Sequence, residues 1–353
     1  MGITSSPMKT YRIGVLGGDG IGPEVVAEAV KVLRAVQDGF RFEFTDLPYG
    51  ADHYLRTGEL ISDESFERIK GFDSILLGAL GDPRVPTGVL ERGVLFRLRF
   101  GLDLYVNLRP IKLYSEALCP IKGKGPRDVD ILVCRENTED AYSGEVRFEN
   151  RGTPDEVAIQ EARYTWRGCE RIIRYAFERA RGRRRKVTLV DKANAVRGHD
   201  LWRRVFDAVA RDYPDVQKDN AFVDATCMWM VKNPEWFDVI VTTNMFGDII
   251  TDLGAMIQGG MGIAAGGNLH PGRVSVFEPI HGSAPKYKGQ RKVCPLAAIL
   301  AGGMMLEHLG EKAAADRVEG AVRRLLESGR LPSLDASSGV PTDRQGDMVL
   351  DFL

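Results

Sequence analysis

The chain has 353 residues, 44% of them hydrophobic and 27% charged, which is the composition of a globular protein long enough for two domains. Its formal net charge of −1 provides no global attraction to nucleic acid or to a membrane surface, and no apolar run is long enough to predict a transmembrane helix. The five cysteines are scattered without a Cys-x-x-Cys pair, so neither a disulfide framework nor a cysteine zinc site is expected, and the expected compartment is cytoplasmic.

The start of the chain predicts a strand, a tight turn and a helix. Residues 11–16 form a β-rich run, and apolar residues at helical spacing follow from Val25 to Val36. The glycines between them stand at positions 18, 20 and 22 rather than in the G-x-G-x-x-G pattern, and Asp19 adds negative charge where a phosphate would bind. A tight turn is therefore favoured over a Rossmann dinucleotide site. Residues 2–6 also fit a myristoylation pattern, although a short leader is favoured there.

Strand-like and helical segments alternate along the rest of the chain. The strand-like runs are residues 40–47, 74–77, 130–134, 187–190 and 239–243, and the helical patterns are residues 168–180, 200–210, 248–256, 295–308 and 311–328. This alternation predicts an α/β fold with a largely parallel sheet. Residues 143–160 break the pattern because they are polar and contain Gly152 and Pro154, so they predict a protruding arm that contacts a partner subunit.

Three aspartates form a candidate metal site. Asp248 and Asp252 stand four residues apart in a helical pattern, so they share one helix face. Two carboxylates on one face repel each other, and a bound cation would reverse that repulsion. With Asp224 as a third oxygen ligand, the set would select Mg²⁺ or Mn²⁺ over zinc. The alternative, in which Asp248 caps the helix and Asp252 is solvated, fits the spacing equally well.

Several basic residues are candidates for binding an acidic substrate. Arg99, Arg109 and Arg135 lie in mostly apolar surroundings. Arginine forks bind carboxylates through two hydrogen bonds, so three of them around one cavity would suit a polycarboxylate, whereas ordinary ion pairing is the alternative for each. The basic run at residues 179–186 lacks interleaved aromatic residues, which favours a solvated turn over nucleic-acid binding.

Two further residues are candidates for proton transfer. Lys192 directly follows a buried strand pattern, the usual place for site residues in α/β folds, and beside a divalent cation it could act as a base. Tyr142, seven residues after Arg135, is a candidate proton donor. On composition alone, a structural role is the alternative for both residues.

Six motifs in the same order resemble the isocitrate/isopropylmalate dehydrogenase family of β-decarboxylating dehydrogenases. They are GDGIGPE at 18–24, NLRP at 107–110, RENTEDAY at 135–142, DKAN at 191–194, NMFGDIITDLG at 244–254 and FEPIHGSAPKYKG at 277–289. The resemblance covers residues 11–353 and implies a fold other than Rossmann. A large cofactor-binding domain is expected from residues 1–104 and 260–353, and a small domain from residues 105–259. Homodimers with shared active sites are also implied, with residues 143–160 as the dimerisation arm.

The resemblance gives each candidate residue a role. Tyr142 and Lys192 match the catalytic acid and base, and Lys192 would come from the second subunit. The metal ligands are Asp224, from that same second subunit, Asp248 and Asp252. The substrate-binding residues are Leu95, Arg99, Arg109, Arg135 and Asn194, and the cofactor-binding residues are His281, Gly282, Ser283, Ala284, Lys286, Tyr287 and Cys294. The implied reaction is metal-dependent oxidation of a 2-hydroxy di- or tricarboxylate, followed by loss of CO₂.

The segment before Arg99 indicates the substrate. Isocitrate enzymes of the family carry a serine and an asparagine where this chain has Gly93 and Leu95, so the apolar pair favours 3-isopropylmalate, oxidised to 4-methyl-2-oxopentanoate in leucine biosynthesis. Arg92 and Arg97 depart from the isopropylmalate pattern, which leaves isocitrate, homoisocitrate, tartrate and D-malate as alternatives. A regulatory subunit of a hetero-oligomeric dehydrogenase is the non-enzymatic alternative, disfavoured because the catalytic and metal-binding residues are present.

The coenzyme signals point to both NAD and NADP. NAD-dependent members have an Asp-Ile pair where this chain has Lys286 and Tyr287, the pair that meets the 2′-phosphate of NADP in isocitrate enzymes. Cys294 replaces the asparagine that commonly contacts the adenine. The tyrosine and arginine that usually accompany the lysine have no clear match in residues 331–346. The sequence therefore favours NADP slightly, with Mg²⁺ or Mn²⁺ as the metal.

Overall fold

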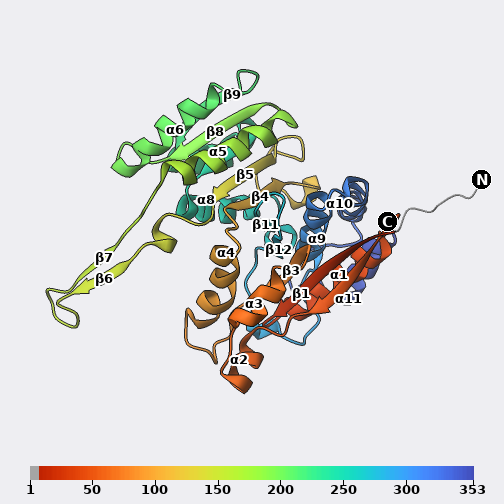
Figure 1. The fold of residues 1–353 in the computed structure, drawn as a ribbon. Coiled ribbons are helices and arrows are strands. Elements are labelled where there is room, and N and C mark those ends of the chain that lie inside the picture. Colours follow the sequence, from red (N-terminus) through yellow and green to blue (C-terminus); the bar gives the residue numbers. More distant parts are fainter. Residues whose placement is uncertain (1–7) are drawn as a thin grey trace, which may run out of the picture. The chain divides into compact units, whose positions relative to one another are not determined.

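The computed structural model describes residues 8–353, which divide into two compact units. The terminal unit contains the residues up to Leu102 together with Gly259–Leu353, and the central unit contains Asp103–Gln258. Each unit has helices around a mostly parallel sheet (Figure 1), so the predicted α/β class is confirmed. The myristoylation pattern at residues 2–6 lies outside the described residues. Within residues 8–353, no helix is both long enough and apolar enough to span a membrane.

The terminal unit combines strands from both ends of the chain in one sheet. Its strands are β1 (Lys9–Gly18), β2 (Phe40–Asp46), β3 (Ser74–Ala79), β11 (Ala265–Leu269) and β12 (Val276–Pro279), in the spatial order β2-β1-β3-β12-β11. Its helices are α1 (Gly22–Ala35), α2 (Ala51–Thr57), α3 (Asp63–Ile69), α4 (Arg97–Gly101), α9 (Leu296–His308), α10 (Lys312–Glu327) and α11 (Thr342–Leu350). Helix α9 is apolar on nearly all sides and buried, as expected of a helix enclosed by other elements.

The central unit contains five sheet strands and a projecting hairpin. Its sheet strands are β4 (Val106–Lys112), β5 (Asp130–Glu136), β8 (Lys186–Asp191), β9 (Gln217–Phe222) and β10 (Val239–Thr242), in the spatial order β4-β5-β10-β8-β9. Its helices are α5 (Trp166–Arg181), α6 (Asp200–Ala210), α7 (Val223–Lys232) and α8 (Asn244–Ile257). Strands β6 (Val146–Glu149) and β7 (Val157–Gln160) pair as a separate antiparallel hairpin that extends away from the unit (Figure 1).

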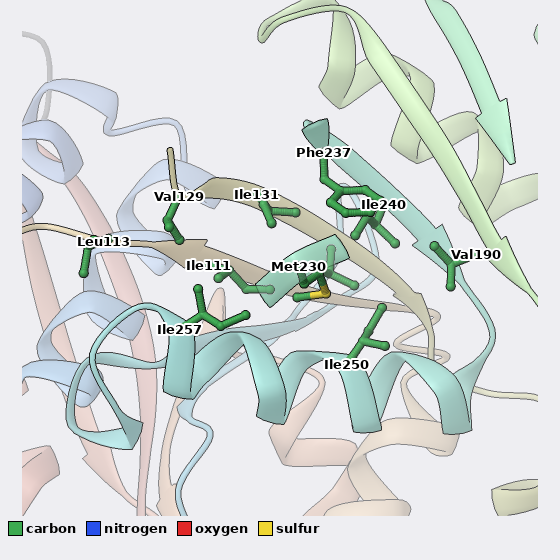
Figure 2. Packing of buried hydrophobic residues seen from close by; sticks show 11 residues of the cluster. Ile111, Leu113, Val129, Ile131, Val190, Met230, Phe237, Ile240, Ile250 and Ile257 are labelled. Carbon is green, nitrogen blue, oxygen red and sulfur yellow. The ribbon is translucent and has the colours of Figure 1, made fainter. Parts of the chain in front are cut away.

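Buried apolar side chains fix helix α8 against the central sheet (Figure 2). Ile250 and Ile257, two turns apart on α8, belong to a cluster that also includes Ile111 of β4, Val133 of β5 and Ile240 of β10. Full burial of one such side chain stabilises a fold by roughly 1.5–3 kcal/mol. The apolar face of α8 therefore determines how the polar residues on its other faces are placed.

Four strands of the central unit end at the same level of the sheet. The candidate site residues lie just after these carboxyl ends. Arg135 of β5 pairs with Thr242 of β10, which pairs with Val190 of β8, which pairs with Ala221 of β9. These four strands are parallel, so their carboxyl ends form one edge of the sheet, where α/β proteins usually bind ligands. The segments that carry Tyr142, Lys192, Asp224 and Asp248 all begin at this edge.

Candidate active site

Arg135, Tyr142 and Asp248 form one polar group at this edge of the central sheet. Arg135 is almost fully buried, and its Nε and Nη2 donate to Asn244 Oδ1 at 3.0 and 2.7 Å, while its Nη1 donates to Asp248. The Tyr142 hydroxyl donates to the other carboxylate oxygen of Asp248 at 3.0 Å. Gly247 makes this approach possible, because a Cβ there would lie 2.5 Å from Cγ of Arg135. The predicted acid and one predicted metal ligand are therefore in direct contact.

The structure agrees only in part with the alternative interpretation, in which Asp248 caps the helix and Asp252 is solvated. Helix α8 begins at Asn244, four residues earlier than the sequence pattern indicates, so the alternative in which Asp248 caps the helix is wrong. Asp252 is exposed in the single chain, as that alternative supposed. Burial by itself raises the pKa of Asp248, but Arg135, the Tyr142 hydroxyl and Arg109 together hold it below its ordinary value. Desolvation by the surrounding protein, followed by the charge of Asp248, raises the pKa of Asp252 even though the side chain is exposed by area.

Lys192 and Asp224 form a second polar group. Lys192 Nζ lies 2.6 Å from Asp224 Oδ1, and the hydrogen bond from Lys192 lowers the pKa of Asp224. The Asp224 side chain is 67% exposed, so it is available to a ligand or to another chain. In the same motif Asp191 is fully buried and binds Arg203, whereas Asn194 is exposed. The predicted base and the third predicted metal ligand therefore form a pair of their own.

The carboxylates of this protein are ligands of the kind that a hard cation prefers. Within a single copy of the chain, however, they do not form a complete metal site. Among residues 8–353, no group of three or more His, Cys, Asp or Glu side chains is placed to hold a metal ion. The two α8 aspartates would supply only two carboxylate ligands, because Asp224 is paired with Lys192 instead. Carboxylates without thiolate or imidazole partners match Mg²⁺ or Mn²⁺. The donor chemistry fits such an ion, provided that a further ligand comes from outside the chain.

The candidate arginines are buried, which distinguishes them from ordinary surface residues. Arg99 in α4 and Arg109 in β4 are each less than a tenth exposed. Arg109 Nε donates to the fully buried Asn107 Oδ1 at 2.9 Å, which fixes the side chain within NLRP. Buried guanidinium groups need acidic or carbonyl partners, so their burial favours a role in binding carboxylates.

Several polar residues of the RENTEDAY motif have structural roles that the sequence did not reveal. Glu136 is buried and accepts hydrogen bonds from the backbone and hydroxyl of Thr138 and from the backbone of Glu139. Burial raises the pKa of Glu136 to about 6. Glu139 in turn accepts from the backbone of Thr165, which caps α5. Asn244, which orients Arg135, was also missed, because its burial and its place at the start of α8 are visible only in the structure.

The segment that selects the substrate by resemblance has an unusual backbone. Residues Glu91–Phe96, including Leu95, form a π-helical turn, a feature frequent at functional sites. Gly93 lies against Leu60, since a Cβ at Gly93 would be 2.1 Å from Leu60 Cδ1 and 2.9 Å from its Cγ. A serine at position 93 would therefore require Leu60 to move.

The additional arginine at position 97 is already engaged within the terminal unit. Its guanidinium pairs with Asp63 and lies 4.6 Å from the ring centre of Phe66. An ion pair and a cation–π contact together hold it on α3. This engagement removes one reason to expect a more polar substrate.

The glycine motif after β1 packs against the predicted cofactor loop. Gly20 has a φ of 57°, and a Cβ there would lie 1.9 Å from the carbonyl oxygen of Ser283. Ile21 N donates to that same carbonyl at 2.9 Å. Asp19 uses both carboxylate oxygens on the backbone N–H groups of Ala51 and Gly81. The motif is therefore a tight structural turn, as predicted, and it also supports the loop, which was not predicted.

Two residues of the predicted cofactor loop indicate what the loop can bind. His281 Nδ1 lies 3.1 Å from the carbonyl of Gly282, which requires a proton on Nδ1 and leaves Nε2 as an acceptor in the neutral ring. This Nε2 is buried without a hydrogen-bond partner among residues 8–353, and burial lowers the pKa of His281. Burial raises the pKa of the Cys294 thiol to about 12, so that residue offers only a small apolar surface.

A cavity of about 370 Å³ lies beside this loop in the terminal unit. It is lined by Gln290, Arg291, Lys292, Ala336, Ser337, Gly339, Val340 and Pro341. Glu24 at the start of α1 accepts from the backbone of Gly289 and Arg291, which orders the loop. The loop therefore offers two features to a ligand. One is His281 Nε2, an acceptor without a partner among residues 8–353, and the other is the set of basic residues between positions 286 and 292.

The basic run at residues 179–186 is largely ion-paired. Arg181 pairs with Asp215, and Arg183 pairs with Asp130 and Asp238. The run connects α5 to β8, as predicted. Its arginines are not only solvated, as expected of a surface turn, but also form ion pairs with carboxylates of the central unit. These pairings leave little free positive charge for a nucleic acid.

Comparisons with known proteins agree with the motifs and the geometry. The family model described as isocitrate/isopropylmalate dehydrogenase matches residues 12–349. The chain is 50% identical over 337 residues to a 3-isopropylmalate dehydrogenase of Corynebacterium efficiens, covering 94% of this chain and 98% of that one. It is 49% identical over 320 residues to a 3-isopropylmalate dehydrogenase of Thermobifida fusca, covering 89% and 90%.

Solved structures show the same relationship. The isocitrate dehydrogenase of Methylococcus capsulatus superimposes with a TM-score of 0.87 at 38% identity, covering 97% of this chain and 98% of that one. The β-decarboxylating dehydrogenase of Thermococcus kodakarensis has a TM-score of 0.79 at 34% identity, covering 97% and 95%. The chain therefore belongs to the isocitrate/isopropylmalate dehydrogenase family.

Proposed function

We propose that this dehydrogenase oxidises and decarboxylates 3-isopropylmalate to 4-methyl-2-oxopentanoate, the reaction of leucine biosynthesis. The observation that carries the proposal is the near-full-length identity of about one half to proteins named 3-isopropylmalate dehydrogenase. Gly93 and Leu95 support it, because they place no polar side chain where a third substrate carboxylate would need one. The packing of Leu60 against Gly93 further opposes a serine at that position.

The side chains of the site account for the two chemical steps. Lys192 takes the proton of the substrate hydroxyl, and Tyr142 gives a proton to the carbon from which CO₂ departs. Arg99, Arg109 and Arg135 hold the substrate carboxylates in place. Asp248, Asp252 and Asp224 would hold a Mg²⁺ or Mn²⁺, which would supply Lewis acidity toward the hydroxyl and the ketone, and a nicotinamide coenzyme would supply the hydride acceptor.

The metal ligands support a homodimer with shared active sites. Asp248 and Asp252 stand on α8, while Asp224 pairs with Lys192 at the other polar group. In the proposed dimer, each site combines Asp248, Asp252 and Tyr142 of one subunit with Lys192 and Asp224 of the partner subunit. Two-fold symmetry then makes two identical sites from the two polar groups of each chain.

Exposed apolar side chains mark the surface that a second copy would cover. Met245, Ile249 and Met256 form a stripe on one face of α8, with Ile249 55% exposed. Met228 and Val231 lie one turn and two turns beyond Asp224 on α7, with Met228 66% exposed. These stripes run beside the acidic residues, and exposed apolar surface of this kind marks interaction sites.

The hairpin of β6 and β7 provides a second contact surface. It has only two strands and displays exposed apolar side chains, including Val146, Phe148 and Val157. An isolated two-stranded hairpin is at best marginally stable in water, so it gains stability by packing on another chain. We therefore assign residues 143–160 as the dimerisation arm.

The terminal unit supports a dinucleotide coenzyme. The unpartnered acceptor of His281 suits an amino or hydroxyl donor of an adenosine group. Gly282, Ser283 and Ala284 supply the loop backbone, and Cys294 supplies a small apolar contact. Lys286 and Tyr287 match the pair that meets the 2′-phosphate in NADP-dependent members of the family, which slightly favours NADP over NAD.

A panel of hydroxy acids tests the proposed function. With Mg²⁺ or Mn²⁺, kcat/KM for 3-isopropylmalate is expected to exceed that for isocitrate, homoisocitrate, tartrate and D-malate by roughly two orders of magnitude, because an apolar pocket leaves extra polar groups unpaired. Each acid is assayed with NAD⁺ and NADP⁺, and NADP⁺ is expected to give the higher value. A preference for another acid would contradict the substrate assignment. An inactive homodimer that activates a partner chain would instead support the regulatory-subunit alternative.

A further inference from the structure

A partly buried series of hydrogen bonds runs through the central unit from Lys192 to helix α8. The backbone N–H of Lys192 donates to His199 Nδ1 at 3.0 Å, and His199 Nε2 lies 3.0 Å from the Tyr164 hydroxyl. The Tyr164 hydroxyl donates to Asp140 Oδ1 at 2.7 Å, and Asp140 Oδ2 accepts from the backbone N–H of Met245 at 2.9 Å. We call His199, Tyr164 and Asp140 the positioning chain.

The hydrogens of the positioning chain have one arrangement that satisfies every group. Because His199 Nδ1 accepts from a backbone N–H, the ring proton lies on Nε2 and is donated to Tyr164. Tyr164 then has its own proton available for Asp140. Burial lowers the pKa of His199, and burial together with Asp140 raises the pKa of Tyr164, so both side chains stay neutral. A buried network with all partners satisfied holds its members rigidly.

Packing also restrains the side chains of the positioning chain. His199 and Asp140 are each 1% exposed. The His199 ring lies edge-to-face with Tyr164, at 5.1 Å between centres, and with Phe246 of α8, at 5.3 Å. A Cβ at Gly198 would come within 3.3 Å of the Tyr164 ring, so the backbone approaches it closely.

The ends of the positioning chain coincide with the segments that carry the proposed catalytic residues. Asp140 Oδ1 also accepts from Ala141 N at 2.8 Å and so caps the turn Ala141–Ser143, which contains Tyr142. Its other oxygen binds the first turn of α8, the helix that carries Asp248 and Asp252. At the opposite end, His199 holds the main chain of Lys192 itself.

The positioning chain also joins the segments on either side of the arm, residues 143–160. Asp140 N donates to the carbonyl of Arg163 at 3.0 Å, which joins the residues immediately before and after the hairpin. Gln160 Nε2 donates to the carbonyls of Ala141 and Gly144 at 2.9 and 3.1 Å. The segment that is proposed to contact the partner subunit is therefore anchored on the same residues.

We propose that His199, Tyr164 and Asp140 are positioning residues, which fix the Lys192 main chain relative to the Tyr142 turn and the start of α8. In the proposed dimer, each subunit uses Tyr142 in one active site and places Lys192 in the other. The positioning chain would then make these two groups move as one rigid body. This inference rests on the roles assigned to Lys192 and Tyr142 under the proposed function. The three residues act through those groups, so their loss should affect turnover more than binding.

The variant Tyr164→Phe tests the proposal with little change in shape. It removes the hydroxyl that joins His199 to Asp140 while the ring keeps its packing. A shift of Lys192 by a fraction of an ångström is expected to lower kcat by about tenfold or more, since misplacement by about 1 Å can cost about 100-fold. The KM values for the hydroxy acid and the coenzyme are expected to change by less than about threefold. The deuterium isotope effect on kcat with substrate labelled at C2 is expected to increase.

Tyr213→Phe is the matched control, because Tyr213 is also a mostly buried tyrosine of the central unit whose hydroxyl binds a side chain, Glu178. It should leave kcat unchanged. His199→Asn keeps an acceptor for Lys192 N–H and is expected to retain more activity than His199→Leu. Thermal unfolding and size-exclusion chromatography verify the fold and the dimer of each variant.

The outcomes separate this inference from the proposed function. If Tyr164→Phe keeps the kcat and the isotope effect of the Tyr213→Phe control, the positioning role is wrong while the proposed function stands. The role is also wrong if activity falls only in proportion to a loss of folded dimer. If the wild-type enzyme turns over none of the hydroxy acids, the assignment of Lys192 and Tyr142 fails, and the inference fails with it.

Discussion

Lys192→Ala is expected to lower kcat by about three orders of magnitude, within the range of about 10²–10⁴ that a positioned general base contributes. The ammonium group lies 2.6 Å from Asp224, on the loop that directly follows β8. Removing the Lys192 side chain takes away the amine that accepts the hydroxyl proton in its neutral form, and it leaves Asp224 without its partner. Because the Asp224 side chain is largely exposed, the fold should tolerate the change.

Steady-state kinetics with saturating substrate and metal provide the measurement for this variant. Lys186→Ala is the control, because Lys186 lies at the start of β8, the strand that precedes Lys192, and also pairs with an aspartate, Asp219, at 3.1 Å. That control is expected to keep kcat within about twofold, as for a surface ion pair of small effect. Turnover by Lys192→Ala close to the wild-type value would reject Lys192 as the base.

Asp252→Asn is expected to have opposite effects on activity and on the stability of the metal-free protein. Loss of an oxygen ligand should lower kcat/KM by about 10²–10³. This decrease corresponds to the several kcal/mol by which a bound metal stabilises charge in the transition state. Partial burial and Asp248 raise the pKa of Asp252, so its ionised form costs stability above that pKa, and the cost disappears as pH falls through it. The neutral asparagine should therefore increase the free energy of unfolding at neutral pH, by about 0.3–0.5 kcal/mol for a like-charge pair one turn apart.

Urea unfolding in EDTA at pH 7 and at pH 4 measures the stability effect, and the gain should be smaller at pH 4. Addition of Mg²⁺ and substrate should stabilise the wild type but not Asp252→Asn, because only the folded wild type binds them. Asp207→Asn is the control, since Asp207 lies on α6 and pairs with Lys218 at the surface. A variant that still responds to Mg²⁺ as the wild type does would show that Asp252 is not a ligand.

Local sequence patterns were sufficient to predict most of the elements around the site. The run at residues 187–190 became β8 and the pattern at residues 200–210 became α6, because apolar periodicity directly reports which face is buried. Helix α8 was predicted to start at residue 248 but begins at Asn244. Its first turn contains Asn244 and Gly247, which face Arg135 and interrupt the apolar periodicity from which the helix was predicted.

Contacts between segments distant in sequence could not be predicted. Nothing in the spacing of Gly20 and Ser283 shows that their backbones meet, because tertiary packing alone brings them together. The pairing of Lys192 with Asp224 depends on the parallel register of β8 and β9, which the sequence does not specify. His199 was missed for the same reason, since a single histidine in a loop has no pattern from which its partners could be inferred.

Complementation between two inactive variants most directly tests the claim that each active site combines residues of two subunits. Lys192→Ala and Asp252→Asn are mixed, unfolded and refolded together, and heterodimers are verified by native mass spectrometry. In a shared-site dimer, one of the two sites of each heterodimer carries both substitutions and the other carries none. The mixture should then recover about a quarter of wild-type activity, because half of the dimers are mixed and half of their sites are intact. If verified heterodimers remain as inactive as either parent, the site lies within one chain and the account is wrong.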